Sequence, residues 1–123
     1  MAFALVALAA DWPWGDFQGH SHWHNVRWIP FVSPPVTLLD MFQNVRLFAP
    51  FGFFAALGHR RPARRVVGRV ALMATGIALL GEGSQIYSHG RIPSATDLAC
   101  NVLGAVLAAG LALSPFVQDI IAS

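Results

Sequence analysis

The chain has 123 residues, of which 55% are hydrophobic and only 11% are charged, and its formal net charge is +2. Soluble domains carry about 25% charged residues, so this composition argues against a soluble monomer and favours a membrane as the solvent. The length allows one domain over residues 1–123. The single cysteine, Cys100, excludes an internal disulfide and any multi-cysteine metal site.

Residues 1–10 are apolar but too few to cross a bilayer. Ten helical residues rise about 15 Å, which is half of a hydrocarbon core of about 30 Å. We expect a short or half-inserted N-terminal helix, with a fourth span as the alternative. A cleaved signal peptide is disfavoured because the segment lacks a basic N-terminal region.

Residues 11–37 contain all four tryptophans and several prolines. Tryptophan favours the headgroup level of a membrane, where its ring is half buried and its N–H stays hydrated. Proline removes a backbone donor and prevents a long helix. We therefore expect an interfacial loop on the outer surface of the membrane.

Three histidines of this loop, His20, His22 and His24, alternate along the chain. In an extended segment they would lie on one face, and neutral imidazoles placed in this way could bind zinc or copper. Because the tryptophans already explain the segment as an interfacial anchor, we expect no bound metal and no cofactor.

Three longer apolar segments follow, at about 38–57, 66–87 and 95–117. Each approaches the roughly 20 residues that cross a bilayer as a helix. The sequence therefore predicts an all-α, polytopic transmembrane helical bundle, with three full spanning helices and the short N-terminal helix. Pro50 and Gly52 interrupt the first of these segments, and we expect a kink there.

All eight basic residues are arginine, and five of them lie between positions 60 and 69. Because this cluster separates two apolar segments, the positive-inside bias predicts a cytoplasmic loop at 59–69 in a bacterial inner membrane. By alternation, 11–37 and 88–95 would be periplasmic or extracellular. The expected partner of the chain is the lipid bilayer, and a nucleic acid is not expected.

The polar residues of the spanning segments gather near their outer ends. An ionised carboxyl group at the centre of a bilayer costs about 2.5–3.5 kcal/mol on insertion scales, so such groups should face the bundle and pair. We expect Glu82, Arg91 and Asp97 to form one coupled unit. The predicted polar cluster, which is either a binding site or a structural lock, comprises Asn44, Arg46, Glu82, Gln85, Arg91, Asp97 and Asn101.

Small residues accompany these polar groups. Asp97 and Asn101 are four residues apart and share a helical face with Gly104 and Ala108. Small side chains allow the close helix–helix contact that membrane bundles use. The predicted helix-packing residues are Pro50, Gly52, Gly104 and Ala108.

Two stretches of the chain resemble the VanZ-like family. WIPFVSPPVTLLDMFQNVRLFAPFGFF matches an Ile-Pro-Phe segment followed by a helix with the pattern Asn-x-x-x-Phe-x-Pro-x-Gly, and GEGSQIYSHGRIPSATDLACNVLGAVLAAG matches a signature with Glu-x-x-Gln, Arg and Asp-x-x-x-Asn-x-x-Gly. The resemblance covers about residues 28–112. The residues carried over by position are Asn44, Phe48, Pro50, Gly52, Glu82, Gln85, Arg91, Asp97, Asn101 and Gly104.

The resemblance implies a small integral membrane protein of the cell envelope, in a family named for a protein linked to low-level teicoplanin resistance. We expect the outward polar cluster to bind a lipid headgroup, a cell-wall precursor or a glycopeptide. The alternative is a non-catalytic accessory subunit of a larger membrane complex, such as a photosynthetic or respiratory assembly. An enzyme using Glu82 or Asp97 as general base ranks last, because no activated nucleophile is visible.

Overall fold

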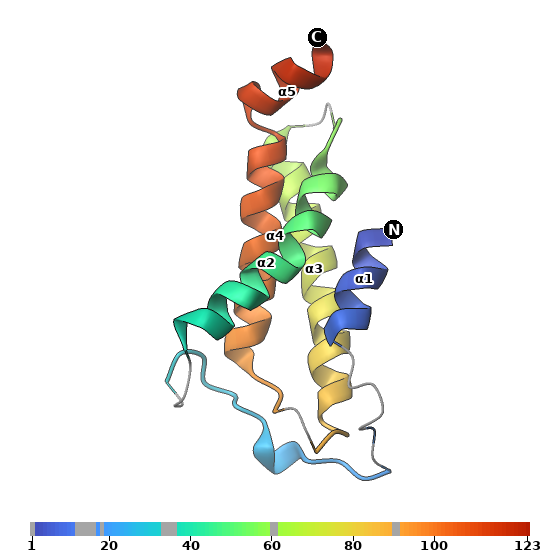
Figure 1. The fold of residues 1–123 in the computed structure, drawn as a ribbon, viewed down its shortest axis with the longest axis vertical. Coiled ribbons are helices and arrows are strands. Elements are labelled where there is room, and N and C mark those ends of the chain that lie inside the picture. The colour runs from blue at the N-terminus through green and yellow to red at the C-terminus, as the bar shows by residue number, and fades with distance from the viewer. Residues whose placement is uncertain (1, 12–16, 18, 33–36, 60–61, 90–91) are drawn as a thin grey trace.

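The computed structural model describes residues 2–11, 17, 19–32, 37–59, 62–89 and 92–123. Within these ranges the chain forms α-helices, one 3₁₀ turn and two isolated β-bridges, without a strand, which confirms the all-α prediction (Figure 1). The elements are α1 (Ala2–Asp11), η1 (Trp23–Asn25), α2 (Leu38–Ala56), α3 (Ala63–Gln85), α4 (Ala95–Ala112) and α5 (Pro115–Ala122).

Helix α4 is the centre of the bundle. Helix α2 crosses it obliquely and makes the most extensive contact, while α3 packs along it as its second partner (Figure 1). The core between them is built largely from alanines, with Phe48 and Val70 as its largest fully buried apolar side chains. Small core residues bring the helices close together, as expected where lipid removes the hydrophobic drive for association.

The closest approach occurs at two glycines of the predicted packing set. A Cβ atom on Gly104 would lie 2.0 Å from the carbonyl oxygen of Val45, and one on Gly52 would lie 1.9 Å from that of Ala105. Helices α2 and α4 are therefore in direct backbone contact at both points. Of the other two residues of the set, Pro50 is exposed and Ala108 is half-buried.

Among the described residues, α3 and α4 are the helices long and apolar enough to cross a membrane. Only 33% and 39% of their apolar windows are buried inside the structure, whereas the core helix of a soluble protein would be mostly covered. Helix α2 does not join them, because its first half carries Asp40, Asn44 and Arg46. The third full span therefore stays a prediction.

The last apolar segment does not continue as one helix to residue 117. Helix α4 ends at Ala112, and α5 starts at Pro115 after the N-cap Ser114, whose Oγ accepts from the Val117 N–H at 3.5 Å. The Gln118 side chain donates to the carbonyl oxygen of Ala112 at 2.7 Å. A serine N-cap followed by proline at the first helical position is a strong start signal for a new helix. The apolar segment is therefore divided into two helices.

The loop between α2 and α3 is also shorter than the predicted loop 59–69. Helix α3 begins at Ala63 rather than Val66, so Arg64, Arg65 and Arg69 lie in its first two turns. Alanine and arginine are good helix formers, and a long arginine side chain can extend to the interface from inside a helix. Arg60 and Arg61 lie outside the described residues.

Candidate functional site

The aromatic loop 19–32 runs across the end of the bundle where α3 ends and α4 begins (Figure 1). Hydrogen bonds join this loop, at His22, Arg27 and Phe31, to the end of α3 and the start of α4. They are His22 N–H to Ile86 O at 2.7 Å, Arg27 N–H to Pro93 O at 2.9 Å, Ala95 N–H to Arg27 O at 2.9 Å, and Phe31 N–H to Thr96 Oγ1 at 2.8 Å. The loop is therefore a fixed cover over the polar end of the helices.

Glu82 lies in the last turn of α3 and is only 7% exposed. Its Oε2 accepts the backbone N–H of Ser94 at 2.7 Å. Ser94 is the N-cap of α4, and its own Oγ accepts from the Thr96 N–H at 3.2 Å. A carboxylate at a helix N-terminus is favoured by the helix dipole, so Glu82 joins the end of α3 to the start of α4.

Asn44 and Asp97 make the corresponding link between α2 and α4. The Asn44 Nδ2 donates to Asp97 Oδ1 at 2.9 Å and to the carbonyl oxygen of Asp40 at 3.1 Å. The structure therefore brings together one pair of the predicted cluster, Asn44 and Asp97, near the α4 N-terminus, where Glu82 contacts Ser94.

Asn101 lies one turn deeper in α4 and is 0% exposed. Among the described residues, neither its Nδ2 nor its Oδ1 has a hydrogen-bond partner. Gln85 is also buried, at 2% exposure, in the last turn of α3.

Arg46 and Arg91 are the two remaining members of the predicted cluster. Arg46 is exposed on α2, where it lies two residues beyond Asn44 and so points to a different side of the helix. Arg91 lies outside the described residues, and the expected unit of Glu82, Arg91 and Asp97 therefore stays a prediction.

A pocket of about 370 Å³ lies between the aromatic loop, the end of α3 and the start of α4. Its wall is mainly apolar, but one cationic residue, Arg27, and one anionic residue, Glu82, line it together. Trp23 and Trp28 lie on the loop side, with their rings nearly parallel and their centroids 6.3 Å apart. We call this space the loop pocket.

Arg27 and Ser94 are site residues that the sequence interpretation missed. Arg27 lies among the tryptophans of the interfacial loop. A single basic residue between aromatic side chains is the feature of the sequence that could have identified it as a site residue. Ser94 is a serine three residues before Asp97, which is the pattern of a helix N-cap.

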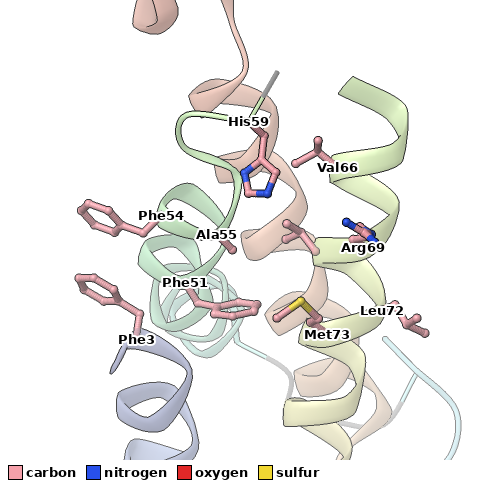
Figure 2. Close-up of a pocket in the computed structure, with 10 residues that line it drawn as sticks. Phe3, Phe51, Phe54, Ala55, His59, Val66, Arg69, Leu72 and Met73 are labelled. Carbon is pink, nitrogen blue, oxygen red and sulfur yellow. The ribbon is translucent and has the colours of Figure 1, made fainter. Parts of the chain in front are cut away.

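A larger cavity of about 550 Å³ lies toward the other end of the bundle, between α1, α2 and α3. Figure 2 shows Phe51 and Met73 pointing into the space between α2 and α3, with His59 and Arg69 near it. Phe3 and Phe54 stack beside it with centroids 4.4 Å apart. None of the described members of the predicted cluster lines this cavity, so the loop pocket is the better candidate for a specific site.

Helices α3 and α4 are long and apolar enough to cross a membrane, and they expose large apolar side chains, which indicates a small helical membrane protein. A family model described as VanZ/LLP1 matches residues 1–118, and the chain belongs to this family. The match extends the resemblance of residues 28–112 toward both ends of the chain. Comparison with curated proteins and with solved structures finds no match.

Proposed function

We propose that this VanZ/LLP1 protein is an envelope protein of the bacterial cytoplasmic membrane, and that its loop pocket binds the headgroup of a zwitterionic phospholipid. The observation that carries the proposal is the joint presence of Arg27 and Glu82 in a mainly apolar wall. The proposal assigns the pocket a binding role and no reaction.

The chemistry of the pocket supports a ligand with both charges. The planar guanidinium of Arg27 suits a phosphate group, which it can hold through two parallel hydrogen bonds. The carboxylate of Glu82 suits a primary ammonium, since it accepts several donors at once. The apolar residues beside them, such as Leu79 and Leu98, suit the start of an acyl chain.

The proposal includes an orientation, with the loop pocket outside the cell and the arginine-rich start of α3 inside. Single cysteines placed by Ala63→Cys and by Ile92→Cys in a Cys100→Ser background would test it, because both positions are exposed. We expect an impermeant thiol reagent added to intact cells to label the Ile92→Cys variant only. Labelling of the Ala63→Cys variant alone would reverse the orientation.

Binding is tested with short-chain phosphatidylethanolamine added to the protein purified in mild detergent, read by tryptophan fluorescence. Trp23 and Trp28 line the pocket, so occupation should change their emission. We expect Arg27→Gln to weaken binding at least about tenfold, because a hydrogen bond to a charged group contributes about 1.5–3 kcal/mol.

Arg46→Gln is the matched control, since Arg46 is exposed and absent from the pocket wall. Equal loss in both arginine variants, or no response to the phospholipid, would contradict the proposal. If the purified protein retains a cell-wall precursor or a glycopeptide instead, that molecule is the ligand of the pocket. Stable co-purification of a larger membrane complex without lipid binding would favour the accessory-subunit alternative.

A further inference from the structure

We propose that His20, His22 and His89 form a zinc-binding site on the outer surface of the aromatic loop. Their ligand nitrogens all lie within 4.8 Å of one another. The three residues come from two segments far apart in the sequence, and none of them lines the loop pocket. The site is therefore independent of the proposed lipid-binding function.

The spacing of the nitrogens agrees with joint coordination of one ion. The Nε2 atoms of His20 and His89 are 3.3 Å apart. Two imidazole nitrogens bound to a tetrahedral zinc at about 2.0–2.1 Å are separated by about 3.3–3.4 Å. The same distance allows one N–H···N hydrogen bond between neutral rings, so the experiment must separate the two cases.

The orientation of His22 favours the metal. Its Nδ1 lies 3.2 Å from the carbonyl oxygen of Ile86, which makes Nδ1 the N–H donor and leaves Nε2 as the free ligand atom. Metal-binding histidines commonly donate their second nitrogen to a backbone carbonyl in this way. The ring of His22 is also 4.7 Å from that of His20 and 4.5 Å from that of His89, measured between centroids.

The backbone holds the two segments in register. An isolated antiparallel bridge pairs Phe17 with Ser88, and the His22 N–H donates to Ile86 O. These contacts place His89 opposite His20 and His22 before any ion is bound. A site that needs little rearrangement loses less binding energy to ordering.

His24 is left out of the site although it belongs to the same alternating run. Residues 23–25 form the 3₁₀ turn η1, so the segment is not extended there. Among the described histidines, the ring of His24 has one neighbour, that of His22, with centroids 6.1 Å apart. With three imidazoles, the ion keeps a fourth position for water or an exogenous ligand, and imidazole ligands suit zinc.

The test is zinc titration of the full chain in detergent, without a histidine tag, by calorimetry and by metal analysis after dialysis. We expect about one zinc per chain and a rise in thermal midpoint on zinc addition, because a ligand that binds only the folded state stabilises it. Removing an exposed ligand by His89→Ala or His20→Ala should weaken binding at least about tenfold and abolish the thermal shift.

His24→Ala is the matched control, since it removes a neighbouring imidazole that is not part of the site. We expect it to keep both the stoichiometry and the affinity of the wild type. Absence of zinc binding would leave the His20–His89 contact as a hydrogen bond and would overturn the proposal. A loss in the His24→Ala variant equal to that in His89→Ala would also overturn it, because the loop would then bind zinc only as a histidine-rich segment.

Discussion

Replacing Gly104 by alanine is expected to destroy the packing of α4 against α2. The added Cβ atom would lie 2.0 Å from the carbonyl oxygen of Val45, and no rotamer change can relieve a clash with backbone. Ordinary overpacking costs about 1–3 kcal/mol, and we expect a loss above this range. The measurement is the thermal midpoint in detergent together with the monodisperse fraction on size-exclusion chromatography.

The same helix offers a control for this variant. A Cβ atom on Gly110 would meet no atom within 4 Å, so Gly110→Ala should leave the stability unchanged or raise it by about 0.5–1 kcal/mol through helix propensity. Gly52→Ala should behave like Gly104→Ala, because its Cβ would lie 1.9 Å from Ala105 O. A Gly104→Ala protein as stable as Gly110→Ala would show that the helices are not in backbone contact.

Replacing Glu82 should give different results for alanine and glutamine. Glu82→Ala leaves the buried Ser94 N–H without its acceptor, and we expect a loss of about 1.5–3 kcal/mol in stability. Glu82→Gln keeps a carbonyl oxygen at that position and should lose less. It removes the negative charge, however, so binding of phosphatidylethanolamine should fall in both variants.

Ser84→Ala is the control for burial in the same helix. Ser84 is also buried, but its Oγ donates to Gly81 O within α3 and not to another element. We expect it to keep ligand binding and to lose less than about 1 kcal/mol. If Glu82→Gln keeps both the stability and the binding of the wild type, the negative charge of Glu82 is not needed for binding, and the role proposed for it is wrong.

Much of the helical architecture follows from the sequence because it depends on local features. The start of α2 at Leu38 was predicted, and the Thr37 hydroxyl caps it by accepting the Asp40 N–H at 3.1 Å. Composition predicted helices with apolar surfaces, and spacing put Asp97 and Asn101 on the face of α4 that carries Gly104. The break at Ser114 and Pro115 was also present in the sequence, but the continuous apolar run concealed it.

The contact partners of the glycines could be identified only from the tertiary structure. The sequence indicated that Gly52 and Gly104 suit close packing, but it did not identify the partners. Val45 and Ala105 become partners only when α2 crosses α4 at one particular register. Small side chains permit several registers, and the packing of all the helices selects one of them.

The arrangement of residues in the aromatic loop depends almost wholly on tertiary contacts. The alternation along the sequence grouped His24 with His20 and His22. In the structure His24 lies in the 3₁₀ turn η1, and the histidine beside His20 is His89, which is 69 residues away in the sequence. Arg27 is likewise placed by contacts with a distant segment, since its backbone is hydrogen-bonded to Pro93 and Ala95 and its side chain lines the loop pocket with Glu82. Helical and strand periods describe neighbours along one element, whereas these contacts depend on how an irregular loop closes over the ends of two helices.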